Sequence, residues 1–369
     1  MNFDFSEEQE LLREQARRML ADRDALGRSR KSLNEDGVFD AELWHEMAEL
    51  GWLGTALPEE YGGAGLSYVD LCVIAEELGR ANAAVPFAST VYILAEAILR
   101  FGNEEQKQHW LPKIVAGDVV GAFATAEGAG PVTESRVQAS VAAGQLTGKK
   151  VAVADGVDAS LLLVLAKESG KPGLYLVQAD ADGVETTAVK MNDRSRPASA
   201  VTFTGPKAEA LTTEDGWDAY QTLLDRAAIL VAFEQVGGSQ ACLEMARDYS
   251  LERYAFGRQI GSFQAIKHKL ADVYVATQIA RSNAYYGAWA LNADAAELPI
   301  AAATARVAGC RAFELASKEN IQTHGGMGFT WELDCHLYYR RAKNLGLALG
   351  SARLWKNRLV SQLETRNVA

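Results

Sequence analysis

One segment near residue 250 combines an arginine with aromatic and amide side chains at regular spacing. Arg253 is followed by Phe256 and Gly257, and then by Phe263 and Gln264. A guanidinium offers a planar fork of N–H donors that matches a phosphate or a carboxylate. The segment has two interpretations: Arg253 complements the dipole of a helix that Gly257 ends, with both Phe rings in the core, or it binds an anionic ligand.

A second segment, from Gln322 to Phe329, contains Gly325, Gly326 and Gly328. Glycines let a backbone approach a ligand closely, although such a cluster also serves as a helix cap and turn. His324 lies in this segment and His268 follows the first one, and neither has a partner at metal-ligand spacing. We therefore expect hydrogen-bonding roles for both histidines and no metal site.

The elements that would position these segments are mainly helices. Ser6 and Gln9 form a predicted capping box at the start of an N-terminal helix, and apolar helical stretches follow over residues 69–79 and 90–101. From residue 216 the chain is helical again, with four expected helices and the first reaching Arg253. Four helices of this kind favour a bundle.

Short β-rich runs separate the two helical parts, over residues 119–125, 137–142, 151–154, 161–165, 174–177 and 200–203. No helix-length segment lies between them, which favours a small barrel or sandwich. The sequence therefore predicts an α+β chain of three domains: helical over residues 1–118, β over 119–213 and a helical bundle over 214–369.

Composition limits the classes of partner. Of the 369 residues, 48% are hydrophobic and 23% charged, and the formal net charge is -11. No basic stripe and no membrane-length apolar stretch are present, so we expect neither nucleic-acid nor membrane binding. The N-terminus lacks a secretory signal, and we expect a cytoplasmic protein. The scattered cysteines are expected to be reduced core thiols: Cys72, Cys242, Cys310 and Cys335.

Together the two segments resemble the acyl-CoA dehydrogenase family. Its C-terminal bundle carries a Tyr-x-x-x-Arg-x-x-Phe-Gly-x-x-Ile-x-x-Phe-Gln segment and a later Gln-x-x-Gly-Gly-x-Gly segment. Residues 51–52 and 58–63 resemble its N-terminal signature, and Leu111-Pro112 with Gly117 its entry into the β domain. The resemblance implies a flavoprotein that moves a hydride from Cβ of an acyl-CoA to flavin N5 while a carboxylate takes the Cα proton.

The same resemblance implies which residues bind FAD. In the family, the conserved side chains of both segments hold the adenine-dinucleotide end of FAD across a dimer interface. In this chain they are Arg253, Phe256, Gln264, Gln322, Gly325 and Gly326. Thr125 is retained from a third family segment, which contacts the flavin. Electron-transfer flavoprotein is the electron acceptor that the resemblance implies.

Around the flavin ring the chain departs from the family. The family's Thr-Glu-Pro-Gly-x-Gly-Ser-Asp segment keeps Thr125 and its glycines here but loses the Glu, Pro, Ser and Asp. A later strand, where the family has a Trp against the ring and a hydroxyl near N5, carries Ala152 and Ala154. Flavin-ring binding by this β domain is therefore not expected.

The expected base is also absent. Leu349 stands where many members have the catalytic glutamate, and the alternative position on the long helix holds Ala227 or Ala228. Glu234, two helical turns further along and roughly 10 Å away, is a weak substitute. For Glu332 and Asp334 we favour a salt bridge with Arg340 or Arg341.

Three hypotheses remain. The first is a subunit that completes the FAD site of a catalytic partner, as in bacterial heterotetrameric dehydrogenases of the steroid type, acting on a bulky acyl-CoA. The second is a self-sufficient homotetrameric enzyme with a relocated base such as Glu234. The third is a non-catalytic scaffold on the same fold, or a relative that oxidises another substrate.

Overall fold

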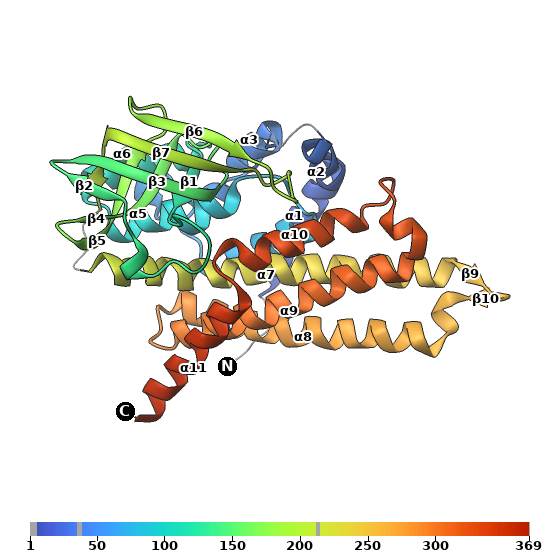
Figure 1. Cartoon of the computed structure of the whole chain (residues 1–369). Coiled ribbons are helices and arrows are strands. Elements are labelled where there is room, and N and C mark those ends of the chain that lie inside the picture. The colour runs from blue at the N-terminus through green and yellow to red at the C-terminus, as the bar shows by residue number, and fades with distance from the viewer. Residues whose placement is uncertain (1–5, 35–38, 212–214, 369) are drawn as a thin grey trace. The chain divides into compact units, whose positions relative to one another are not determined.

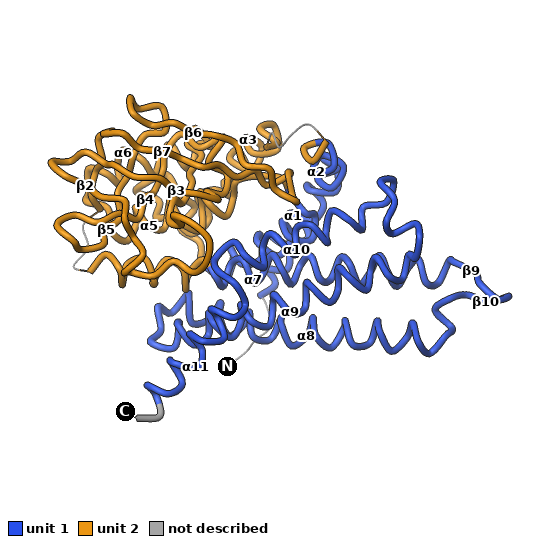
Figure 2. The backbone as a smooth tube through the Cα atoms, in the orientation of Figure 1, with its two compact units in different colours: residues 1–31, 68–83, 228–369 blue, residues 32–67, 84–227 orange. Residues whose placement is uncertain are grey.

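The computed structural model describes residues 6–34, 39–211 and 215–368 (Figure 1). The chain divides into two compact units, one made of residues 1–31, 68–83 and 228–369 and the other of residues 32–67 and 84–227 (Figure 2). We call them unit 1 and unit 2 and describe each by itself. Unit 1 thus joins two N-terminal helical segments with most of the C-terminal bundle.

Helices fill the first third of the chain, as predicted. Ser6 caps the first of them, because its Oγ accepts from the backbone N–H of Gln9 and the Gln9 side chain accepts from the backbone N–H of Ser6. The helices are α1 (Glu7–Asp22), α2 (Ala25–Asn34), α3 (Ala41–Glu49), α4 (Tyr68–Arg80), α5 (Glu96–Phe101) and α6 (Glu104–Val115). Short 3-10 turns, η1 (Trp52–Gly54) and η2 (Glu59–Tyr61), and a π-helix, η3 (Ala88–Ala95), connect them.

Unit 2 contains one eight-stranded mixed sheet, in the order β6-β7-β3-β2-β4-β5-β8, with β1 pairing parallel to β4. The strands are β1 (Gly121–Ala124), β2 (Ser140–Ala142), β3 (Gln145–Ala154), β4 (Leu161–Glu168), β5 (Lys171–Gln178), β6 (Val184–Val189), β7 (Ala198–Lys207) and β8 (Glu209–Ala210). One face packs on an apolar core that includes Leu162, Val164 and Phe203. The six predicted β-rich runs all fall on strands, and β6 and β8 are additional.

The bundle contains α7 (Gly216–Glu252), α8 (Gln264–Asn292), α9 (Leu298–His324) and α11 (Ala352–Val368), the four helices that the sequence predicts. A fifth, α10 (Cys335–Ala348), was not expected. The order helical, β, helical is the predicted α+β architecture, whereas the domain boundaries at residues 118 and 213 stay a prediction.

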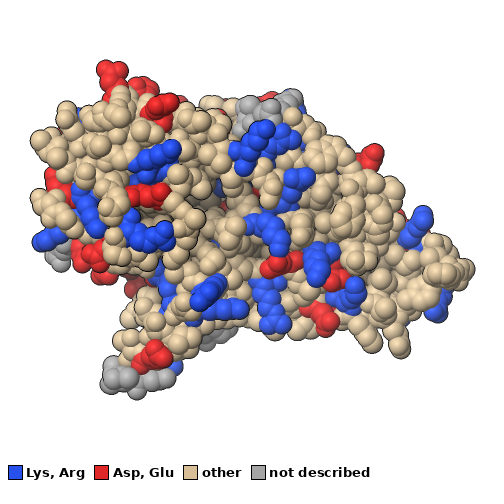
Figure 3. Space-filling model, in the orientation of Figure 1, with Lys and Arg blue, Asp and Glu red and all other residues tan. Residues whose placement is uncertain are grey.

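Within the described ranges, no helix is both long and apolar enough to cross a membrane, and no cluster of His, Cys, Asp or Glu could hold a metal ion. All four cysteines are buried free thiols, as predicted. On the face that Figure 3 displays, Lys and Arg side chains lie among Asp and Glu side chains.

Candidate functional site

The arginine segment forms a β-hairpin at the end of α7 (Figure 1). Strands β9 (Tyr254–Ala255) and β10 (Arg258–Gln259) pair antiparallel, and Phe256 and Gly257 form the turn with φ of +52° and +78°. Positive φ at both central residues is the geometry of a tight hairpin turn. The interpretation of Gly257 as a helix stop was therefore wrong: α7 already ends at Glu252, and Gly257 closes the hairpin.

Phe256 stands out at the hairpin tip because its side chain is 95% exposed. A bulky residue with positive φ is strained, and its ring packs edge to face with Phe263, with 6.2 Å between the ring centroids. The Arg258 guanidinium lies 4.0 Å from the centre of the Phe263 ring. The tip thus presents aromatic and cationic groups to solvent, which is typical of a surface that another molecule covers.

The two sequence segments meet in unit 1. The Tyr249 ring, one turn before Arg253, stacks on His324, with centroids 4.2 Å apart and an interplanar angle of 28°. His324 Nδ1 lies 2.9 Å from the Asn320 carbonyl oxygen, so this histidine has the hydrogen-bonding role that we expected. The stack therefore brings the end of α7 close to the turn after His324.

That turn, η6 (Gly325–Phe329), requires glycine at its first residue. Gly325 has φ of 60° and ψ of -135°, a combination that residues other than glycine avoid. A Cβ added to Gly325 or Gly326 would meet nothing within 4 Å, so the space beside both glycines is open. Gln322 and Gln264 are exposed amides on the flanking helices. Amide and guanidinium groups are donors of the kind that suit a pyrophosphate, whereas the Gly325 N–H already donates to the Gln322 carbonyl.

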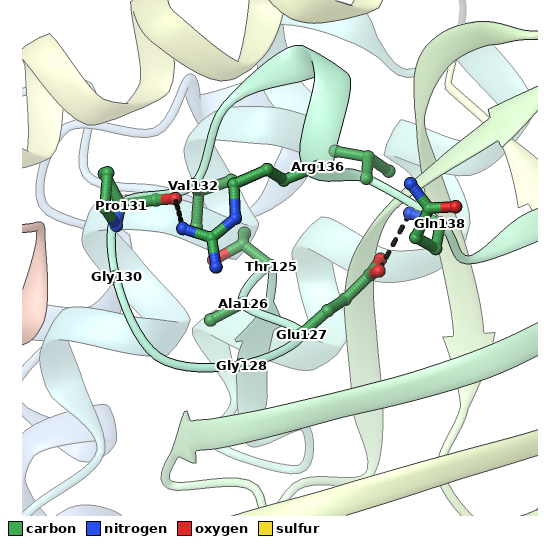
Figure 4. A pocket seen from close by; sticks show the side chains of 10 residues that line it. Thr125, Ala126, Glu127, Gly128, Gly130, Pro131, Val132, Arg136 and Gln138 are labelled. Atoms are coloured by element: carbon green, nitrogen blue, oxygen red, sulfur yellow. Dashed lines mark hydrogen bonds between the residues drawn. The ribbon is translucent and has the colours of Figure 1, made fainter.

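In unit 2, the segment that begins at Thr125 (Figure 4) is held by a buried lysine. Lys150 has no exposed side-chain surface, and its Nζ donates to Glu127 Oε1 at 2.7 Å and to the Thr125 and Leu165 carbonyls at 3.2 and 2.5 Å. Burial lowers the pKa of Lys150, and the hydrogen bond from Glu127 opposes this shift. Sequence analysis missed this pair, whose members are joined only by the pairing of distant strands.

Known proteins match the chain over nearly all of its length. The model for the acyl-CoA dehydrogenase N-terminal domain matches residues 6–118, and the model for the C-terminal domain matches residues 214–363. Acyl-CoA dehydrogenase IpdE2 of Mycobacterium tuberculosis is 33% identical over 360 residues, which cover 97% of this chain and 98% of that protein. The chain belongs to the acyl-CoA dehydrogenase family.

Solved structures agree. A variant of the Tcur3481-Tcur3483 steroid ACAD is 31% identical and covers 98% of this chain and 99% of its own, with a TM-score of 0.89. The ChsE4-ChsE5 complex from Mycobacterium tuberculosis is 29% identical with 99% of both chains covered and a TM-score of 0.90. Acyl-CoA dehydrogenase FadE27 of Mycobacterium tuberculosis is 31% identical, with 85% of this chain and 86% of that protein covered.

Acyl-CoA dehydrogenases use FAD. The residues that we expect at its dinucleotide end and at its flavin-ring end differ in how well they suit the cofactor. The residues expected at the dinucleotide end are exposed at Arg253, Gln264 and Gln322, and the space beside Gly325 and Gly326 is open. The ring end does not fit the same way. Ala152 lies at a bulge of β3 with φ of +51°, Ala154 ends that strand, and both methyl groups offer neither a stacking face nor a hydroxyl.

The residues that we expect at the family's base positions are buried. Leu349 is 7% exposed, and its carbonyl oxygen accepts from the buried Trp355 indole at 3.0 Å. Ala227 and Ala228 are fully buried, and the adjacent Arg226 side chain forms a buried ion pair with Glu96. Sequence analysis missed this pair as well. Leucine and alanine side chains have no group that could accept a proton at either position.

The other candidate carboxylates are packed in the bundle or held in a salt bridge. Glu234 is 3% exposed within the bundle. Burial lowers the pKa of Arg306, and the nearby charge of Glu234 opposes this shift. Asp334 forms a salt bridge, as expected, but the predicted partners Arg340 and Arg341 were wrong: its carboxylate accepts from Arg30. The pairing of Arg30 with Asp334 could not be seen in the sequence, because more than three hundred positions separate the two residues.

Proposed function

We propose that this chain is a subunit of an FAD-dependent acyl-CoA dehydrogenase and completes the FAD site of a catalytic partner. The observation that carries the proposal is the contrast within one chain. The donor set for the dinucleotide end is retained and exposed at the hairpin and η6, whereas the ring contacts and both base positions hold Ala or Leu.

In this proposal Arg253 binds the pyrophosphate as a bidentate donor, and Gln264 and Gln322 bind neighbouring polar groups with their amides. The open space beside Gly325 and Gly326 lets a phosphate approach the backbone closely, although the Gly325 N–H already donates to the Gln322 carbonyl. Phe256 loses its exposed surface when the partner covers the hairpin tip. FAD held in this way would supply the hydride acceptor for oxidation of an acyl-CoA, and in this proposal the proton acceptor belongs to the partner.

Two of the similar solved structures support a heteromeric assembly, because their names contain two different chains, ChsE4-ChsE5 and Tcur3481-Tcur3483. We infer a tetramer of two unlike subunits acting on a bulky, steroid-like acyl-CoA, with electron-transfer flavoprotein as the electron acceptor. The name of the second structure, a steroid ACAD, supports this substrate class.

Co-expression tests the proposal. The chain alone should be colourless, whereas the chain with its partner should show flavin absorbance and oxidise acyl-CoA. The chain expressed alone as a yellow, active homotetramer would contradict it.

A self-sufficient homotetramer is the second candidate, favoured by the carboxylate of Glu234 on α7 inside the bundle. Glu234→Gln should then abolish turnover and leave FAD bound. If the chain binds no acyl-CoA in calorimetry, either alone or with its partner, it is a non-catalytic scaffold.

A further inference from the structure

One face of α8 in unit 1 is apolar although it is exposed to solvent (Figure 1). Tyr274, Val275 and Ile279 are 54%, 53% and 54% exposed. Val275 and Ile279 lie four positions apart, so their side chains are neighbours on the same face of the helix. Large apolar side chains that gather on one exposed face are typical of a surface that another molecule covers.

This face continues along about five turns of α8 without an Asp, Glu, Lys or Arg. We call it the α8 stripe, and its members recur every three or four positions: His268, Ala271, Val275, Ile279, Ser282 and Tyr286. All are exposed except Tyr286, which is half-buried. Ser282 Oγ donates to the Gln278 carbonyl at 3.0 Å, so the helix itself satisfies this hydroxyl. The depletion of charge is typical of the core of a protein–protein interface.

The side chains of the stripe follow the same order in both directions. A ring and a small residue precede two β-branched residues, and a small residue and a ring follow them. If two copies of α8 pack antiparallel about the midpoint between Val275 and Ile279, like classes of side chain meet. To within one position, the opposed pairs are Val275 with Ile279, Ala271 with Ser282 and His268 with Tyr286. Such a self-complementary contact is what a two-fold axis between identical chains requires.

The charges on the neighbouring faces of α8 are compatible with this antiparallel packing. Arg281 already donates to Glu76 at 2.9 Å, and Lys269 forms an ion pair with Glu319 at 3.1 Å. Lys267 lies near the N-terminal end of the stripe. A parallel pair would place the Lys267 side chains of both copies side by side, whereas an antiparallel pair puts them at opposite ends.

The area of the stripe indicates a contact made within a larger assembly. The stripe is about 27 Å long and about 10 Å wide, which gives roughly 270 Å² per copy. A stable interface buries about 800 Å² per partner. We propose that the α8 stripe packs antiparallel on the stripe of a second copy of this chain and so joins the two halves of the tetramer. The tetramer rests on the proposed function, whereas the pairing of copies is independent of FAD binding and turnover.

Ile279→Glu tests the pairing by placing a charge in each half of the apolar contact. Association of the copies should weaken at least tenfold. Native mass spectrometry should show that the assembly divides into particles with half the number of chains, which keep their FAD because the hairpin and η6 are unchanged. Leu11→Glu on α1, at a position that is also 54% exposed, is the matched control and should leave the assembly intact.

Adding Val275→Lys to Ile279→Glu tests the register. In an antiparallel pair each introduced cation opposes the introduced anion of the second copy, so the double variant should recover association. In a parallel pair like charges would meet, and the double variant would associate no better than Ile279→Glu alone.

Gln278→Cys identifies the molecule that covers the stripe. Gln278 is partly exposed beside the centre, and the four native cysteines are buried. A short bismaleimide should therefore link two copies of this chain. Linkage to the other chain type, or to no chain either alone or in the complex, would overturn the inference, as would an intact assembly of folded Ile279→Glu. A homotetramer that Ile279→Glu divides into dimers would support the pairing and contradict only the proposed function.

Discussion

Arg253 and Phe256 lie exposed at the hairpin, whereas Leu349, Ala227 and Ala228 are buried where family members place a proton acceptor. An ionised carboxylate buried at such a position would need a partner to offset its lost hydration. Leucine and alanine carry no charge, so no such partner is needed here. At the scale of single residues, our proposal rests on retained groups suited to phosphate and on Ala and Leu at the two positions where we expect a proton acceptor.

Arg253→Gln tests the first half of this contrast. It removes a charge-assisted fork and should weaken FAD binding in the assembled complex by roughly 10- to 100-fold. Flavin content after gel filtration and a fluorescence titration with FAD measure the effect. Arg353→Gln, an exposed arginine on α11, is the matched control. Unchanged FAD affinity in Arg253→Gln would remove this residue from the site.

Asp158 gives a pH-dependent prediction. Burial, together with the charge of Asp155, raises the pKa of Asp158 from 3.8 to about 6, and its Oδ2 is buried without a hydrogen-bond partner. A raised folded-state pKa means that the stabilisation is complete below about pH 4 and is lost as the pH rises through 6.

Asp158→Asn keeps the shape of the neutral acid and removes the titration. The variant should therefore gain stability relative to the wild type between pH 4 and pH 7, by about 1 kcal/mol at this half-exposed position. Thermal unfolding of both proteins across this range measures the difference. A difference that is constant with pH would show that Asp158 titrates normally.

At the scale of elements, the loop after β1 depends on Lys150. Lys150→Met should lower the free energy of unfolding by about 3 kcal/mol, because it leaves Glu127 without its counter-ion and two carbonyls without a donor. Denaturant titration measures the loss. The double variant with Glu127→Gln should recover part of it, and an equal loss in both variants would mean that the ion pair is unimportant.

The hairpin gives the opposite expectation. Phe256→Gly relieves a positive φ and removes a ring that packs edge to face with Phe263, so the isolated chain should be as stable as the wild type or slightly more stable. The same variant should weaken association with the partner, because it deletes the exposed tip. Unfolding midpoints and gel filtration separate the two effects. A destabilised monomer with normal association would contradict the proposed role of the tip.

Several elements could be predicted from the sequence because their signals are local. The capping box at Ser6 and the apolar face of α7 are of this kind. Strand β6 was missed because nearly all of its residues face solvent and show no apolar alternation. The hairpin was mistaken for a helix end because Gly257 serves both structures, and only pairing of Tyr254 with Gln259 distinguishes them.

For the site, local motifs carry the residues that we expect at the dinucleotide end, which stay a prediction, and the Tyr249–His324 stack brings the two segments together. The sequence could not predict the pairs Lys150–Glu127, Arg226–Glu96 and Arg30–Asp334, since strand pairing or helix packing joins each from distant positions.

At the scale of the whole molecule, the chain has the architecture of an acyl-CoA dehydrogenase and lacks that family's proton acceptor at both expected positions. An assembly that shares FAD sites between unlike subunits reconciles these facts, because each site then needs only one complete set of ring and base contacts. It also accounts for the exposed hairpin tip in the single chain.

Native mass spectrometry of the co-expressed complex, with FAD counted per assembly, tests this account most directly. We predict a tetramer with two chain types and one FAD for every two chains. A homotetramer of this chain with one FAD per chain and acyl-CoA turnover would contradict it.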